Sequence, residues 1–218
     1  MERQPEPELM DAVDQARAYA KADFSASNSL LIQLFQQHFP GLTPHRILDL
    51  GCGPADICIR LANTFADAEV TGVDGADAML EFAREAIGRS PARTRIHVVC
   101  DRIQRFNDSQ YDVVVSNSLL HHLADPDDLW HAIRRLTLPG AAIMVMDLMR
   151  PPTRTMVDSI VDTYAGNEPE ILRQDFRNSL CAAFTPDEVS EQLRANDLAQ
   201  LSVEVVSDRH LLVSGRLE

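Results

Sequence analysis

Glycines and carboxylates are spaced in this sequence as they are in ligand-binding turns. An apolar run at 46–50 contains Asp49 and is followed by the glycine-containing turn 51–53, after which a helical pattern begins. The backbone of such a turn can approach a ligand closely, because glycine has no Cβ, and the free N–H groups of a helix start add positive potential. Asp74 ends the next apolar run, roughly 20 positions on, where a carboxylate can accept hydrogen bonds from ribose hydroxyls. These features predict a nucleoside-containing ligand.

Phosphate recognition is poorly supported by the same turn. The dinucleotide fingerprint has a third glycine three positions after the second, and this position is Asp56, whose charge would repel a pyrophosphate. The phosphate-loop pattern is absent, and the only lysine of the chain is Lys21. Asp49, just before the glycines, instead suits a cationic part of a ligand, such as an α-ammonium group.

The segment 47–53 resembles motif I of the class I S-adenosylmethionine (SAM) methyltransferases, an acidic residue followed by Gly-x-Gly-x-Gly. Both glycines of the turn match, and Ala55 stands where many members carry the last glycine. Asp74 matches the acidic residue that binds the ribose in that family. Further stretches resemble the later motifs in the right order: 100–103 the third, 111–117 the fourth, 120–123 the helix after it, and 138–140 the turn before the fifth strand. The resemblance covers residues 45–148.

The alternation of apolar runs with helical patterns predicts an α/β fold, with a parallel sheet covered on both faces. Predicted strands are 46–50, 69–73, 95–100, 111–116, 141–147, 201–207 and 210–215, and predicted helices between them are 54–66, 76–88 and 126–137. The resemblance implies a Rossmann-like, doubly wound, mostly parallel seven-stranded sheet with a C-terminal antiparallel hairpin.

The remaining segments are expected to decorate this sheet. Residues 1–8 are predicted to be a disordered tail, and 9–218 a single methyltransferase domain. Within it, 9–41 is predicted to form two helices, the second with a serine cap, and 149–184 a helical cap insertion over the sheet. Thr185 is predicted to cap the helix that follows.

The resemblance implies SAM as cofactor and assigns residues to it. The cofactor-binding residues are predicted to be Tyr19, Asp49, Gly51, Cys52, Gly53, Asp74, Gly75, Asp101, Arg102, Ser116 and Asn117. Asp101 would meet the adenine amino group, and Tyr19 would close the site over the donor. For Asp49, Asp74, Ser116 and Asn117, capping of a turn or helix is the alternative, and for Tyr19 it is packing.

His121 is the predicted catalytic residue. Removing a proton from a hydroxyl or ammonium acceptor requires a base, and a neutral imidazole suits this role near neutral pH. Since His121 and His122 would face different directions on a helix, only one is expected to point at the cleft. The alternative is that both are capping or packing residues. Arginines of the predicted cap, at 150, 154, 173 and 177, would either bind an acidic acceptor or form surface ion pairs.

Composition narrows the function further. The 218 residues carry a formal net charge of −13, which disfavours a nucleic-acid partner. No apolar run is long enough to span a membrane, and no signal peptide is recognisable. The four cysteines form no Cys-x-x-Cys pair, so no metal site is predicted. We expect a soluble cytoplasmic protein that acts on a small-molecule acceptor, and a homodimer is compatible with these features.

The sequence therefore predicts transfer of a methyl group from SAM to oxygen or nitrogen of a small molecule. Two alternatives keep the fold. One is binding of a modified SAM, because 116–121 loosely resembles a segment of enzymes in the tRNA carboxymethyl pathway, from which His121 departs. The other is a non-catalytic SAM-binding regulatory domain, against which the intact acidic residues argue.

Overall fold

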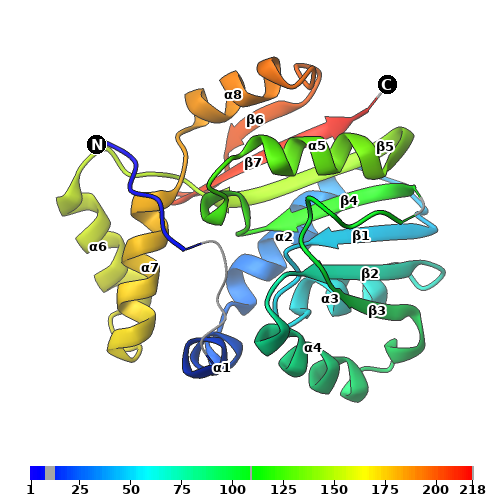
Figure 1. The fold of residues 1–218 in the computed structure, drawn as a ribbon, viewed down its shortest axis with the longest axis horizontal. Helices are drawn as coiled ribbons and strands as arrows, with labels where there is room; N and C mark the ends of the chain where they lie inside the picture. The colour runs from blue at the N-terminus through cyan, green and yellow to red at the C-terminus, as the bar shows by residue number, and fades with distance from the viewer. Residues whose placement is uncertain (8–12, 109, 218) are drawn as a thin grey trace.

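The computed structural model describes residues 1–7, 13–108 and 110–217 (Figure 1). Within these residues, seven strands form one sheet in the order β3-β2-β1-β4-β5-β7-β6. Neighbouring strands from β3 to β5 run parallel, whereas β7 is antiparallel to β5 and β6. The strands are β1 (Arg46–Leu50), β2 (Glu69–Asp74), β3 (Ile96–Cys100), β4 (Tyr111–Asn117), β5 (Thr137–Leu148), β6 (Ser202–Val205) and β7 (His210–Arg216). The predicted fold class, including the C-terminal hairpin, is confirmed.

Helices cover both faces of this sheet. They are α1 (Val13–Lys21), α2 (Ser25–His38), α3 (Asp56–Thr64), α4 (Asp77–Arg89), α5 (Asp127–Leu136), α6 (Arg154–Ala165), α7 (Glu170–Ala182) and α8 (Pro186–Ala195), with short 3-10 helices η1 (Arg93–Arg95) and η2 (Leu120–His122). The described part of the chain contains no helix that is long and apolar enough to cross a membrane.

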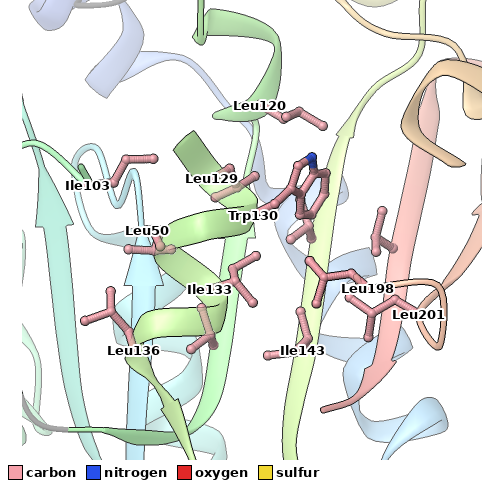
Figure 2. Close-up of a cluster of buried hydrophobic side chains, with 14 of the residues drawn as sticks. Leu50, Ile103, Leu120, Leu129, Trp130, Ile133, Leu136, Ile143, Leu198 and Leu201 are labelled. Carbon is pink, nitrogen blue, oxygen red and sulfur yellow. The ribbon is translucent and has the colours of Figure 1, made fainter. Parts of the chain in front are cut away.

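The two faces bury separate apolar clusters, because successive residues of a strand point to opposite sides of a sheet. Leu48 and Leu50 of β1 pack in the cluster under α5 and α8, whereas Ile47 packs in the cluster under α2, α3 and α4. Trp130 of α5 is fully buried at the centre of the first cluster (Figure 2). Its indole N–H donates to Gln192 Oε1 of α8 at 3.1 Å, so burial leaves its one polar atom satisfied.

The fifth strand starts earlier than the pattern predicts. β5 begins at Thr137 rather than at 141 and includes the Leu-Pro-Gly segment 138–140. Its pairing with β4 shifts register between Tyr111 and Val113, and Gly140 has a φ of +79°. A bulge therefore accommodates a turn sequence inside the strand.

The helical cap has the predicted form of two helices. α6 and α7 pack on each other through Val157, Val161 and Leu180. The chain enters and leaves the cap side by side, because Met149 and Phe184 form a parallel bridge at its base. α7 also contacts α1 and η2, which sets the cap beside the end of the sheet where β1 and β4 finish (Figure 1).

Helix starts agree with prediction in one case and differ in another. Thr185 caps α8 in a full capping box with Glu188, as expected. The break between α1 and α2 is also present, but the predicted serine cap is wrong: Phe24 is the N-cap residue and provides no side-chain bond. Instead Asp23 Oδ1 accepts the N–H of Ser25 at 2.9 Å, an Asx-type turn that precedes the helix.

Residues 1–7, predicted as part of a disordered tail, make several contacts with the rest of the structure; residue 8 lies outside the described residues. The segment runs along α7 (Figure 1), where Gln4 N donates to Cys181 O at 2.9 Å. The Arg3 guanidinium donates to the carbonyls of Ala182, His121 and Leu123 and lies 4.0 Å from the centre of the Phe184 ring. Proline and glutamate suggest disorder, yet one cation that satisfies several carbonyls anchors the segment.

Candidate active site

The glycine turn has the backbone conformation that its sequence predicts. Gly51 has a φ of +74°, Gly53 of +49° and Ala55 of +66°, so the chain is left-handed at three positions before α3. A Cβ on Gly51 would lie 2.8 Å from the Leu119 side chain, whereas one on Gly53 would meet nothing within 4 Å. Glycine is therefore required at position 51 by both conformation and space.

Asp74 links the turn to the second strand. Because β1 and β2 are parallel neighbours, with Leu50 paired to Val73, both ends meet at one edge of the sheet. Asp74 Oδ2 accepts the N–H of Gly53 at 2.8 Å, and its Oδ1 accepts the N–H of Ala76 at 2.8 Å. A carboxylate offers about four acceptor positions, so the group can shape the turn and also accept from ligand hydroxyls.

Three adjoining cavities surround this edge, and Tyr19 and Asn117 border all of them. The first, about 80 Å³, is lined by Asp74, Gly75 and Arg102. The second, about 500 Å³, is lined by residues that include Asn28, Asp49 and Cys52. The third, about 310 Å³, lies between the cap and η2 and is lined by residues that include His121, His122, Leu172 and Phe176.

Asp49 and Tyr19 are titratable groups with strongly altered pKa values. Burial raises the pKa of Asp49 to about 7, although Cys58 Sγ donates to its Oδ2 at 3.2 Å and partly opposes the shift. Burial, with Asp74 nearby, raises the pKa of Tyr19 to about 12. Tyr19 is thus a hydroxyl donor at neutral pH. Asp49 has no cationic partner among the described residues, and the sequence predicts a cationic group of the ligand beside it.

Two predicted ligand residues do not line the cavities. Asp101 Oδ1 accepts the N–H of Arg102 at 2.8 Å and caps the turn after β3. Ser116 is fully buried and donates to Leu50 O at 2.8 Å, which ties β4 to β1. Both carboxyl-end residues are thus bonded to the backbone, whereas Arg102 borders the first cavity.

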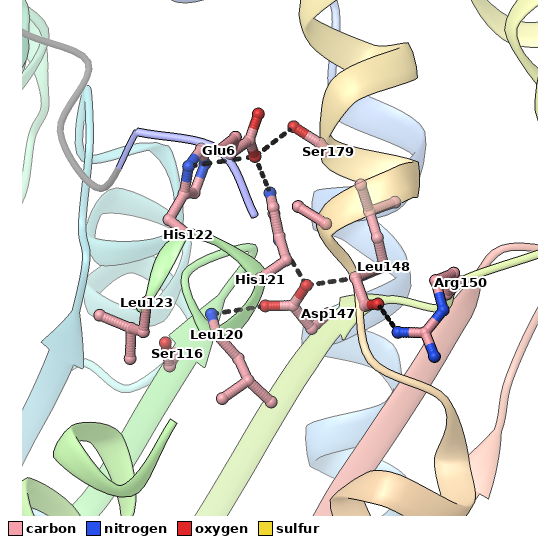
Figure 3. A network of polar contacts seen from close by, with 12 residues as sticks. Glu6, Ser116, Leu120, His121, His122, Leu123, Asp147, Leu148, Arg150 and Ser179 are labelled. Carbon is pink, nitrogen blue, oxygen red and sulfur yellow. Dashed lines mark hydrogen bonds and ion pairs between the residues drawn. The ribbon is translucent and has the colours of Figure 1, made fainter. Parts of the chain in front are cut away.

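His121 occupies a 3-10 turn rather than the expected helix, and its ring is enclosed by two carboxylates (Figure 3). Nδ1 lies 2.5 Å from Asp147 Oδ1, and Nε2 lies 3.5 Å from Glu6 Oε1. Asp147 Oδ2 accepts the N–H of Leu120 at 2.7 Å, so the carboxylate also fixes the turn.

The expectation that only one histidine faces the cleft is wrong. His121 and His122 both line the third cavity, and their ring centres are 4.2 Å apart. In the 3-10 turn, the side chains of His121 and His122 lie on the same side. The α-helical spacing assumed from the sequence would place them on different sides. His122 also borders the first cavity.

The two histidines have opposite pKa shifts. Burial opposes protonation of His121, but the Asp147 carboxylate outweighs it and raises its pKa. Burial, together with His121, lowers the pKa of His122 to about 3. Burial raises the pKa of Glu6. At neutral pH His122 is therefore a neutral imidazole, and His121 is the member of the pair that binds a proton more readily.

Most of the arginines of the cap form ion pairs, which is one of the two roles predicted for them. Arg150 pairs with Glu188 at 2.6 Å, Arg173 with Asp162 at 3.1 Å and Glu170 at 3.4 Å, and Arg177 with Asp158 at 3.0 Å, while Arg154 Nη1 lies 3.5 Å from Cys181 Sγ. The arginine that borders the third cavity is Arg209, whose guanidinium carbon lies 3.3 Å from the centre of the Tyr164 ring.

Sequence reasoning missed three polar residues of the site: Asn28, Asp147 and Glu6. Asn28 Nδ2 donates to Asp56 Oδ2 at 2.7 Å, and its Oδ1 accepts from Asn117 Nδ2 at 3.2 Å. Asn117 Oδ1 is buried without a hydrogen-bond partner among the described residues, so it can accept from a ligand. A signal existed for Asp147, which nearly ends an apolar strand as Asp49 does, whereas Asn28 lies in the serine-rich start of α2 and carries no such signal.

Comparison with known proteins agrees with this geometry. Residues 48–145 match the family model of a methyltransferase domain. The ubiquinone biosynthesis O-methyltransferase of Alkalilimnicola ehrlichii is 31% identical over 126 residues, which are 57% of this chain and 50% of that protein. The trans-aconitate 2-methyltransferase of Variovorax paradoxus is 30% identical over 126 residues, 57% of this chain and 47% of that protein. The chain spans about half the length of the curated relatives it matches.

Solved structures show the same fold at low sequence identity. The plantazolicin methyltransferase BamL, in complex with a triazolic desmethylPZN analog and SAH, has a TM-score of 0.70 at 16% identity over 88% of this chain and 70% of that one. A SAM-dependent methyltransferase from Aquifex aeolicus has a TM-score of 0.69 at 15% identity over 94% and 99% of the two chains. Residues 48–145 are therefore similar to a methyltransferase domain, and the described residues share the fold of these SAM-dependent and plantazolicin methyltransferase structures.

Proposed function

We propose that this protein transfers a methyl group from SAM to an oxygen or nitrogen of a small-molecule acceptor. The observation that carries the proposal is the Asp74 carboxylate, which holds the glycine turn by Gly53 and borders a cavity at the ends of β1 and β2. Names of the relatives support it, because they are O-methyltransferases and other small-molecule methyltransferases.

The cavities suggest how the donor lies. Ribose hydroxyls would bond to Asp74 in the first cavity, and the α-ammonium group would face Asp49 in the second. The protonated hydroxyl of Tyr19, at the junction of the cavities, would donate to the donor's carboxylate. The role of Asp101 at the adenine remains part of the proposal, with Arg102 beside it in the first cavity.

The acceptor would occupy the third cavity, under the cap. A sulfonium methyl group is already activated, so the residues mainly supply proximity, orientation and exclusion of water. His121 would accept the acceptor's proton at Nε2, because Asp147 holds its Nδ1 and so fixes the tautomer. Glu6 faces Nε2, so the N-terminal segment must shift before an acceptor reaches this atom.

A direct assay of this function uses the full chain with methyl-labelled SAM and a panel of phenolic, carboxylic and amine acceptors. We expect label in one acceptor class, with stoichiometric SAH, as detected by mass spectrometry. SAM binding without transfer to any acceptor would instead support the regulatory alternative, and absence of SAM binding would refute the proposal.

Replacing Asp74 by alanine is expected to weaken SAM binding by about 1.5–3 kcal/mol, the loss typical of hydrogen bonds to a charged group. Calorimetry measures the change in affinity. The matched control is Asp77→Ala, which removes an exposed carboxylate on the adjacent helix that pairs only with Arg84 among the contacts described. Equal affinity of a folded Asp74→Ala variant and this control would rule out the ribose role.

Donor affinity is expected to rise with pH through neutrality. Because burial raises the pKa of Asp49 to about 7, a bound α-ammonium group should lower this pKa and release a proton. Affinity should therefore increase between about pH 6 and 7.5, as linkage requires when the complex binds fewer protons. Calorimetry in buffers of different ionisation enthalpy measures the release. If Asp49→Asn retains the same pH dependence, another group is responsible.

A further inference from the structure

Three side-chain atoms that commonly bind metal ions converge beside the third cavity (Figure 3). Glu6 Oε1 lies 3.5 Å from His121 Nε2 and 3.2 Å from His122 Nδ1. All three atoms lie within 4.8 Å of one another. They come from two segments far apart in sequence, the N-terminal segment and η2, so the cluster exists only in the folded chain.

Hydrogen bonding leaves these atoms as electron-pair donors that face one another. His121 gives its Nδ1 to Asp147 at 2.5 Å, so Nε2 of the neutral ring has a lone pair directed at Glu6. His122 Nδ1 is buried and has no partner in hydrogen-bond geometry among the described residues, although Glu6 is close. Such an arrangement requires a cation between the groups, either a shared proton or a metal ion.

We propose that Glu6, His121 and His122 bind a divalent transition-metal ion, with Zn²⁺ as the preferred species. Two imidazole nitrogens and one carboxylate oxygen are a donor set that Zn²⁺ uses with an open fourth position. Bonds of about 2.0–2.1 Å in tetrahedral geometry place donor atoms about 3.3 Å apart. The two distances to Glu6 Oε1, 3.5 and 3.2 Å, are close to this spacing, and the third, between the two imidazole nitrogens, is within 4.8 Å.

Outer contacts hold two of the three ligands, His121 and Glu6, in position. Asp147 on the second nitrogen of His121 forms the carboxylate–histidine pair that commonly supports a metal ligand. Ser179 donates to Glu6 Oε1 at 2.9 Å, and Arg3 fixes the carbonyl of His121. Both histidines line the third cavity, so an open coordination position would face it, where an anionic or hydroxyl oxygen could bind.

The proposed metal site does not depend on methyl transfer, but it shares His121 with the proposed function. A coordinated Nε2 cannot accept a proton, so the metal-bound chain cannot use this atom as a base. Metal binding would also retain the N-terminal segment, because Glu6 becomes a ligand. The sequence does not predict this metal site, because the spacing of its cysteines and histidines matches no metal-binding motif. The carboxylate of the site, Glu6, also comes from a segment predicted to be disordered.

Metal binding to the full chain, stripped with a chelator, tests the proposal. We expect one equivalent of Zn²⁺ by calorimetry and, with Co²⁺ as the probe, the visible absorption of a low-coordinate site with nitrogen and oxygen ligands. Glu6→Gln and His122→Gln should each weaken Zn²⁺ binding by more than the roughly 10–100-fold typical of losing an outer partner. The matched control is His97→Gln, which disrupts an exposed pair with Glu69 at 3.2 Å.

Donor affinity, measured on the same samples, checks that the variants are folded. If His122→Gln does not fold, Glu6→Gln still tests the proposal, because it changes only one atom of a side chain in the N-terminal segment. Zn²⁺ binding that is absent from the wild type, or equal in wild type and folded Glu6→Gln, would overturn the proposal. The cation between the groups would then be a proton. Metal binding is measured without an acceptor, so its outcome does not depend on whether the protein transfers a methyl group. The proposed function and the proposed metal site are therefore tested separately.

Discussion

Gly51→Val is expected to abolish detectable SAM binding while the chain still folds. Valine at a φ of +74° is strained by about 1–3 kcal/mol, and its Cβ would lie 2.8 Å from Leu119, a residue that borders the first cavity. Both effects displace the turn from the position in which Asp74 holds it. Calorimetry or equilibrium dialysis with SAM measures the loss, and a thermal melt measures stability.

Gly41→Val provides the control for backbone strain. Gly41 also has a φ of +74°, but it follows α2 away from the cavities, and an added Cβ would meet nothing within 4 Å. This variant should lose stability to a similar or smaller extent and bind SAM normally. If Gly51→Val also bound SAM normally, the segment would be only a turn, and the donor would lie elsewhere.

His121→Ala is expected to lower turnover at saturating SAM by about 100-fold or more, the range typical of losing a general base. SAM affinity should change little, because the ring borders the third cavity and not the other two. The measurements are kcat on the identified acceptor and donor affinity by calorimetry, with chelator present so that metal does not compete for Nε2.

The pH profile gives this variant a specific signature. A base acts when deprotonated, and the pKa of His121 is raised above its ordinary value of 6.5. Wild-type kcat should therefore rise with pH through a pKa above 6.5, and this limb should disappear in His121→Ala. His97→Ala, on the exposed edge strand, should retain both rate and limb. A fully active His121→Ala would assign proton removal to another group or to water.

The sequence predicts the sheet correctly, and it places Asp49, the glycine turn and Asp74 at one edge, because these features depend on local patterns. Apolar runs that end in Asp49 and Asp74 define strand ends, and parallel pairing then brings the two carboxylates to one edge. The φ of +74° at Gly51 is a local reason for glycine, whereas the contact that an added Cβ would make with Leu119 is tertiary. The strand ends and the glycine spacing can be recognised in a single sequence without knowledge of the tertiary contacts.

The acceptor side is poorly predicted because it is assembled from distant segments. Glu6, His121 and Asp147 form one network, although nothing in their spacing connects them. A 3-10 turn replaces the expected helix at 120–122, and this puts both histidines on the same cavity. Ser116 and Asp101 are strand-end residues that fit a motif, and in the structure each is bonded to the backbone, which the sequence pattern alone does not distinguish from a ligand contact.

A crystal structure of the full chain with SAH tests the central claim most directly. We expect ribose hydroxyls within hydrogen-bond distance of Asp74, the α-ammonium group against Asp49, and the sulfur directed toward the third cavity, near His121. A ligand seated away from Asp74 and the glycine turn would contradict the account, as would crystals grown at saturating SAH in which these cavities contain no ligand.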